Sequence, residues 1–200
     1  MPDPNEEQIN ELLYQALETE LGGVQIYETA LQCAVNEDLK KEWQKYLDET
    51  RKHVDIVTHV FEGIGLDPQI ETPGRQVVRA KAAALVESMK QALSAGNPVA
   101  AQIVAAEAVV EAETKDHQNW ELIGTLSEEL TGDLAKFLKE AHQEVEEQED
   151  EHLYHTMGWA RELWIESLGL KAVLPPPEEK KHVKTAIGQS RAKQARKEMS

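Results

Sequence analysis

Two glutamates lie where a helical sequence should be apolar. Glu20 falls in the middle of a stripe of residues that recur at helical spacing: Leu13, Ala16, Val24 and Tyr27. Glu113 falls in the same way within a second stripe: Ala106, Val109, Val110 and Trp120. Each of the two is followed, seven residues later, by an aromatic residue and another glutamate. A buried carboxylate without a partner is strongly unfavourable, so both must be paired, protonated or bound to a cation.

Histidines are expected at the same level as these carboxylates. His53 follows Glu20 by 33 residues and His152 follows Glu113 by 39, each with a predicted turn about midway. In an antiparallel hairpin, equal arms bring the two residues of each pair to one height. The spacing therefore predicts that His53 faces Glu20 and that His152 faces Glu113.

Each histidine also has a carboxylate one helical turn earlier. The stretch ETRKH (49–53) places Glu49 four residues before His53, and EEQEDEHLYH (146–155) places Glu149 three before His152. Residues at these separations share a helix face and can reach one ion. One glutamate from each of two helices and a Glu–His pair from each of two others predict a site for two metal ions.

Several alternatives share these helix faces. His155 can replace His152 or orient a ligand, and Glu144 or Glu151 can replace Glu149. His117 and, more weakly, Asp116 follow Glu113 by one turn and are additional candidates. The metal-ligand candidates are thus Glu20, Glu49, His53, Glu113, His117, Glu149, His152 and His155.

Four long helices must position these residues. The pattern predicts a helix that begins with Asp3 as cap and Pro4 in its first turn, a turn at 35–38, and a second helix to residue 61. A loop rich in Gly and Pro follows, then an alanine-rich helix over 75–95 and a restart at Asn97-Pro98. The last two long helices are expected to reach residues 130 and 168, separated by a turn at 131–133. The predicted fold is all-α, an antiparallel four-helix bundle with a long crossover that contains a short extra helix.

Composition limits the class of protein. The net charge is −16, while residues 178–200 carry seven Lys/Arg against three Glu, so the remainder carries −20 and is not expected to bind nucleic acid. We expect a bundle over residues 1–170 and a Pro-rich spacer with a basic tail over 171–200. A single cysteine, Cys33, excludes a disulfide framework and a Cys₄ metal site. No window of ~20 apolar residues or signal peptide is evident, which predicts a cytoplasmic protein without a membrane span.

The ligand pattern resembles the ferritin-like superfamily, which includes rubrerythrins, bacterioferritins and small bacterial ferritin-like proteins. The resemblance covers residues 8–165 and rests on spacing more than on a distinctive string. It implies two Fe ions, with Mn as an alternative and Zn possible, that react with O2 or peroxide in ferroxidase or peroxidase chemistry. The chain has no cysteine pairs for a rubredoxin domain, so an external reductant is implied. A homodimer is also implied.

The sequence departs from the family at position 50, where Thr50 stands in place of the glutamate of a Glu-x-x-His pair. Glu49 is one residue early, so the site is expected to be asymmetric if Glu49 does not turn inward. Two alternative functions remain at this point. One is a di-manganese, catalase-like enzyme, and the other is a metal-free helical interaction protein in which cationic side chains neutralise Glu20 and Glu113.

Overall fold

The computed structural model describes residues 4–178 and 185–199. Within these ranges the secondary structure is helical, without strands. The helices are α1 (Glu6–Cys33), α2 (Glu37–Ile64), α3 (Pro73–Ser94), α4 (Pro98–Glu129), α5 (Asp133–Ser167) and α6 (Thr185–Glu198). The predicted all-α class is therefore confirmed. None of the described helices combines the length and apolar character needed to cross a membrane.

Side-chain caps and glycines set most helix boundaries. Asn36 and Asn97 accept backbone N–H bonds at the starts of α2 and α4, and Pro98 occupies the first turn of α4. Gly65 ends α2 in the left-handed conformation, with φ of 73°. The start of α1 differs from the prediction. Its cap is Asn5, which accepts from the Gln8 amide, so Pro4 precedes the helix, and Asp3 lies outside the described residues.

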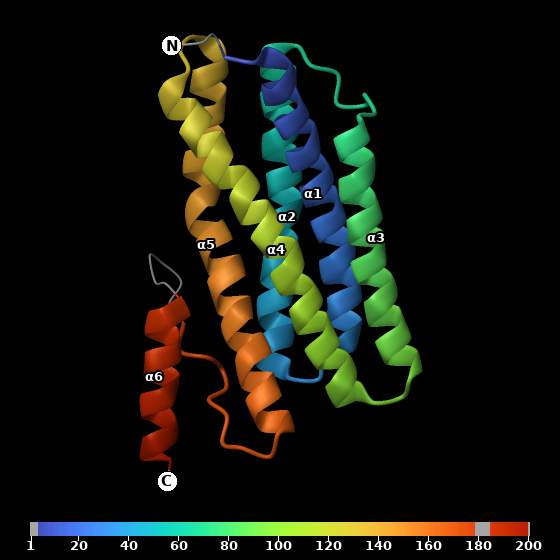
Figure 1. Cartoon of the computed structure of the whole chain (residues 1–200), viewed down its shortest axis with the longest axis vertical. Coiled ribbons are helices and arrows are strands. Elements are labelled where there is room, and N and C mark those ends of the chain that lie inside the picture. The colour runs from blue at the N-terminus through green and yellow to red at the C-terminus, as the bar shows by residue number, and fades with distance from the viewer. Residues whose placement is uncertain (1–3, 179–184, 200) are drawn as a thin grey trace.

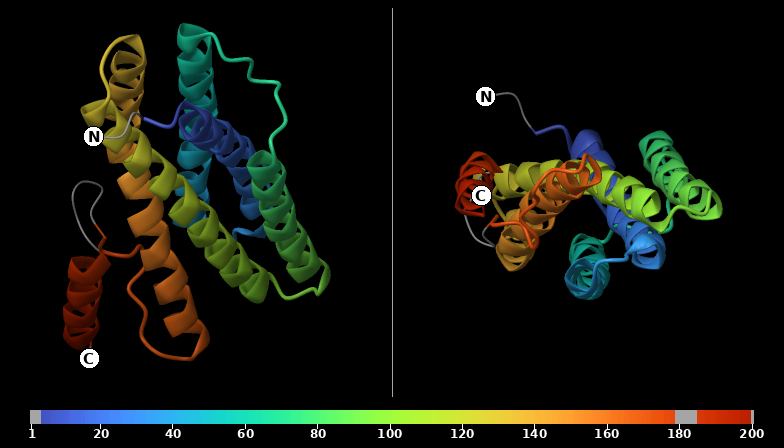
Figure 2. Two further views of the ribbon diagram at one scale, coloured as in Figure 1. Left: turned by 45° about the horizontal axis from the view of Figure 1, so that its top comes forward. Right: turned by 90° about the horizontal axis from the view of Figure 1, so that it is seen from below.

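The helices pack so that α1 contacts α2, α3 and α4, while α5 contacts α2 and α4 (Figure 1). The crossover helix α3 lies against α1 and α4, and its bounds are close to the predicted 75–95. The approach of α1 to α3 is tight at Gly22, where an added Cβ would lie 2.7 Å from the Cβ of Ala82. Helices α3 and α6 lie on opposite sides of the molecule (Figure 2).

The apolar core is divided into two clusters along the bundle. The members of one cluster from the four long helices lie within residues 26–33 of α1, 39–47 of α2, 101–109 of α4 and 159–163 of α5. The members of the other cluster lie within residues 9–17 of α1, 57–61 of α2, 120–123 of α4 and 138–145 of α5. Both clusters stop at the same height in all four helices. Glu20, His53, Glu113 and the segment 149–152 lie in this gap, so the fold places a polar layer between two dry layers.

The C-terminal segment is attached to α5 by buried charges. The Glu162 side chain accepts from Arg196 of α6 at 2.6 and 2.7 Å and from the Val173 amide at 2.9 Å. Arg161 also pairs with Glu162 and with Glu178. Burying a carboxylate is favourable only when it is well paired, as Glu162 is. Part of the predicted basic tail, residues 185–198, thus forms helix α6 and contacts α5 (Figure 1).

We predict that Glu162→Ala releases α6 from α5. The variant leaves Arg196 and the Val173 amide without their shared acceptor, a loss of about 2 kcal/mol for hydrogen bonds to a charged group. Amide hydrogen exchange within α6 should accelerate about 30-fold, because local opening governs exchange there. Glu166→Ala is the matched control, because Glu166 is an exposed glutamate on α5, the helix that carries Glu162. Unchanged exchange in the Glu162 variant would show that other contacts hold α6.

Candidate metal centre

Two groups of ligand atoms lie in the polar layer and share one carboxylate. The first is formed by Glu20, His53 and Glu149, and the second by Glu113, Glu149 and His152. Within each group the donor atoms lie within 4.8 Å of one another, and all five residues are buried. They come from α1, α2, α4 and α5, so the site exists only when these four helices are assembled.

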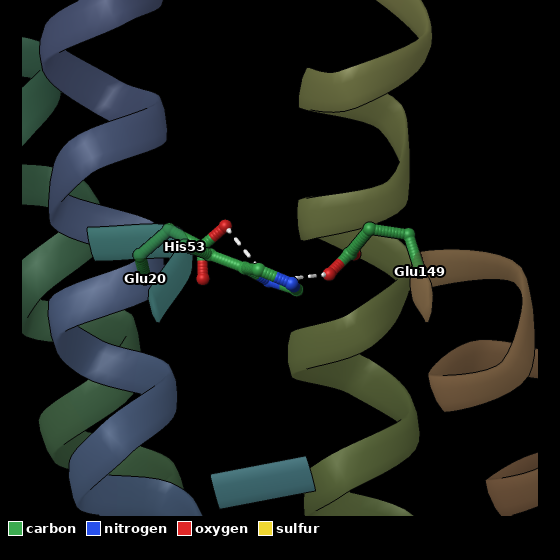
Figure 3. Close-up of side chains that lie close together, drawn as sticks. All are labelled: Glu20, His53 and Glu149. Atoms are coloured by element: carbon green, nitrogen blue, oxygen red, sulfur yellow. Dashed lines mark ion pairs between the residues drawn. The ribbon is translucent and has the colours of Figure 1, made fainter. Parts of the chain in front are cut away.

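The first group is centred on His53. Its Nδ1 atom lies 3.1 Å from Glu149 Oε1 and 3.6 Å from Glu20 Oε1 (Figure 3). The indole Nε1 of Trp120 donates to Glu20 Oε1 at 2.8 Å. This bond fixes one oxygen of Glu20 and leaves Oε2 without a hydrogen-bond partner among the described residues.

The second group repeats this arrangement around His152. Its Nδ1 atom lies 3.6 Å from Glu149 Oε1 and 3.7 Å from Glu113 Oε2. The Tyr27 hydroxyl donates to Glu113 Oε1 at 2.6 Å and leaves Oε2 free to face the histidine. Trp120 and Tyr27, which the sequence suggests as core residues, therefore also orient the two isolated glutamates.

The outer nitrogens of both histidines have their own acceptors. His53 Nε2 lies 3.0 Å from Gln148 Oε1, and His152 Nε2 lies 3.0 Å from Glu49 Oε2. With the Nε2–H donating outward, the Nδ1 lone pair of each ring points into the site. Metal-binding histidines are usually held by such an outer acceptor, which fixes the tautomer and the ring orientation.

Polar atoms inside the layer lack hydrogen bonds from the described part of the chain. They are Glu20 Oε2, His53 Nδ1, Glu113 Oε2, both oxygens of Glu149, His152 Nδ1 and Asp116 Oδ1. Buried polar atoms are normally satisfied, and a concentration of lone pairs in one place needs protons or a cation. The donor set is therefore suited to a metal ion.

Burial and neighbouring charges shift the pKa values of the residues in the layer. Burial, with the negative charge of Glu149, raises the pKa of Glu113 to about 7. Burial also raises the pKa of Glu20. Burial alone would lower the pKa of His53, but the charge of Glu20 and contact with Glu149 raise it well above its usual value. Without a metal, protons thus neutralise the layer, and a divalent cation would displace them.

Asp116 is the fourth carboxylate of the layer. It is 5% exposed, and burial together with the charges of Glu20, Glu149 and Glu113 raises its pKa well above the usual range. Asp116 therefore keeps its proton more readily than an ordinary carboxyl group, and it is not part of either group of ligand atoms. Thr50 brings no charge, because its hydroxyl donates to the Tyr46 carbonyl at 2.9 Å.

The structure does not bring Glu49, His117 or His155 into either group. Glu49 lies outside the layer, bonded to His152 Nε2 and 3.5 Å from Lys45 Nζ, because it is one residue away from the inward position. His117 lies 3.6 Å from Glu121 and 3.7 Å from Asp150, nearer the surface. Of the alternatives to Glu149, Glu144 is exposed and Glu151 pairs with Lys45 at 2.8 Å.

His155 belongs to a separate buried network. Its Nδ1 lies 2.7 Å from Glu42 Oε1 and its Nε2 lies 3.1 Å from the Pro176 carbonyl. Two acceptors, one per ring nitrogen, require the imidazolium form, and the contact with Glu42 raises the pKa of His155 although burial would lower it. Neither Glu42 nor Gln148 emerges from the sequence analysis. The sequence offers one indirect indication of them: each inward-facing histidine needs a hydrogen-bond partner for its second ring nitrogen.

A small cavity leads toward the shared carboxylate between α4 and α5. Its volume is about 230 Å³, and Glu149 and Trp120 line it together with His117, Glu121, His142 and Asp150. The lining is rich in acidic and imidazole groups, which attract divalent cations from solution. Comparison of the chain with family models, curated proteins and solved structures gives no match. The arguments for function therefore rest on this geometry.

Proposed function

We propose that this chain is a ferritin-like, four-helix di-metal carboxylate protein that binds two Fe ions, or two Mn ions as the alternative, and reacts with O2 or peroxide. The observation that carries the proposal is the sharing of Glu149 between two histidine–carboxylate groups. A shared carboxylate can hold two ions ~3.5–4 Å apart, the spacing of two-metal sites. Zn fits the same donors but supplies no electrons.

The type of donor supports Fe or Mn. Carboxylate oxygens and imidazole nitrogens suit these ions, whereas soft metals prefer sulfur. Cys33 is buried in an apolar cluster, and its burial raises the thiol pKa to about 11, so it contributes no ligand to the layer. Two ferrous ions, when bound, supply the two electrons that convert peroxide to water, and an external reductant would restore them.

The chain's own residues would hold and isolate such a pair. Trp120 and Tyr27 each fix one oxygen of a glutamate, and Gln148 and Glu49 orient the two imidazoles. The apolar clusters above and below the layer keep bulk water away. The cavity beside Glu149 gives small reactants a path from the surface.

Metal content tests this proposal. Protein loaded anaerobically with Fe(II) or Mn(II) and desalted should retain about two ions per chain, measured by mass spectrometry. Glu20→Ala/Glu113→Ala should lose them, because it removes one carboxylate from each group. Glu28→Ala/Glu129→Ala is the matched control, since these glutamates are exposed on the same two helices and lie outside the layer and its cavity.

A folded wild-type protein that retains no metal would overturn the di-metal proposal. The bundle would then be a metal-free scaffold, and the polar layer would be held by protons alone. If the ions are retained, consumption of O2 and peroxide by the loaded protein distinguishes Fe-dependent oxidation and reduction from manganese-dependent dismutation of peroxide.

A further inference from the structure

A second cavity lies away from the metal layer, between the crossover helix and the bundle. It has a volume of about 600 Å³ and is lined by residues of α1, α3 and α4. Apolar side chains form most of its wall: Ile26, Val78, Ala82, Leu85, Val110 and Ala112. The volume is within the range of sites that bury small organic ligands. None of the residues of the two metal groups lines it.

The charged residues of this groove are mainly cationic. Lys81 and Lys115 both line it, and neither has an ion pair within the part of the chain that the structure describes. The Lys115 ammonium instead donates to Asn119 Oδ1 at 2.6 Å, and its partial burial lowers its pKa. Glu111 is the acidic residue of the lining and is exposed. Two lysines against one glutamate give +1 in a chain whose net charge is −16.

A hydrogen bond joins two of the helices that form the groove. The Asn119 side-chain amide donates to Thr19 Oγ1 at 3.0 Å and joins α4 to α1, while Thr19 itself lines the cavity. The groove therefore has an ordered polar position next to Lys115, while most of its lining residues are apolar. This pattern fits a ligand with a hydrocarbon chain and one anionic head.

We propose that the groove between α3, α1 and α4 binds an anionic amphiphile, a medium-chain carboxylate whose chain packs on the apolar wall and whose head meets Lys81 and Lys115. Burial of the hydrocarbon contributes most of the affinity. The lysines select an anion over a neutral or cationic head. The proposal does not depend on metal binding, because the groove is formed entirely by residues outside the metal groups.

Isothermal titration of metal-free protein with decanoate tests this site. We expect saturable binding of one decanoate per chain, weaker binding of 1-decanol and the weakest binding of decyltrimethylammonium. Lys81→Gln/Lys115→Gln should weaken decanoate binding about tenfold, as partly exposed charge pairs each contribute up to about 1 kcal/mol. Binding of 1-decanol should not change. Lys40→Gln/Lys52→Gln on α2 carries the same charge change at exposed positions outside the groove and should bind as wild type.

Two further variants separate the groove from nonspecific association. Val110→Trp fills the cavity and should abolish decanoate binding while the metal content stays at that of wild type. Loss of Lys115 also removes its hydrogen bond to Asn119. Lys81→Gln alone leaves that bond in place, because Lys81 is at an exposed position on α3, and it should still weaken decanoate binding several-fold. Equal affinity for the three head groups, or binding unaffected by Val110→Trp, would overturn the proposal. So would a dimer in solution that Val110→Trp dissociates, because the groove would then be a contact between copies of the chain.

Discussion

Glu149→Gln should abolish retention of both metal ions at once. Glu149 is the residue common to the two ligand groups, and both of its oxygens lack hydrogen-bond partners among the described residues. Loss of a residue that merely orients a ligand weakens metal binding about 10–100-fold, so loss of the shared ligand should exceed about 100-fold. Glutamine has nearly the same shape, so helicity by circular dichroism should remain that of wild type. Metal content after anaerobic loading and desalting measures the effect.

Glu144→Gln provides the control for this experiment. It makes the same chemical change on α5, little more than one turn before Glu149, at an exposed position. It should retain wild-type metal content. If Glu144→Gln loses the ions and Glu149→Gln keeps them, the site is not organised around Glu149. If Glu149→Gln loses only one ion, the carboxylate is terminal rather than shared.

Glu20 and Glu113 could be found from the sequence because a charge in an apolar stripe contradicts the pattern around it. Their buried positions and the facing histidines follow from helix periodicity and from the equal hairpin arms. The same reasoning fails for Glu49. One residue turns a helix by about 100°, and Glu49 therefore reaches the outer nitrogen of His152 instead of the layer.

Other parts of the structure depend on contacts that no local pattern encodes. His155 is on an inward face, as its spacing predicts, but its partners Glu42 and Pro176 lie far from it in the sequence or in an irregular segment. The attachment of α6 likewise depends on Arg196 meeting Glu162. Asp116 could have been ranked higher, since it lies one turn from Glu113 and is buried in the same layer.

The division of the core explains why a polar layer is compatible with a stable fold. Each of the four helices contributes apolar residues on both sides of the layer. The bundle therefore keeps two apolar clusters whether the layer is protonated, ionised or bound to metal. The layer itself is destabilising unless its charge is neutralised. Proteins commonly accept such a cost at functional sites, where groups must remain available to a ligand.

Stability of the metal-free protein should fall as the pH rises from about 4.5 through about 7. Burial raises the pKa of Glu113 from 4.5 to about 7, so in this window the folded state binds a proton that the unfolded state has lost. Unfolding free energy then decreases with pH, because its slope follows the protons bound in the unfolded state minus those bound in the folded state. The full shift corresponds to about 3 kcal/mol. His53, whose pKa is also raised, acts in the same direction above pH 6.5.

Urea unfolding at pH 5.5 and pH 8, with and without Mn(II), measures this effect. The metal-free protein should have the lower midpoint at pH 8, and saturating Mn(II) should raise that midpoint most at pH 8, because the ion takes the place of the lost protons. In Glu113→Gln the side-chain amide can still accept the hydrogen bond from Tyr27, but the amide does not ionise. The unfolding midpoint of this variant should therefore depend less on pH than that of wild type. An equally steep profile in the variant would assign the pH dependence to groups outside the layer. A wild-type midpoint that Mn(II) does not move at pH 8 would show that protons and the cation do not compete for these carboxylates.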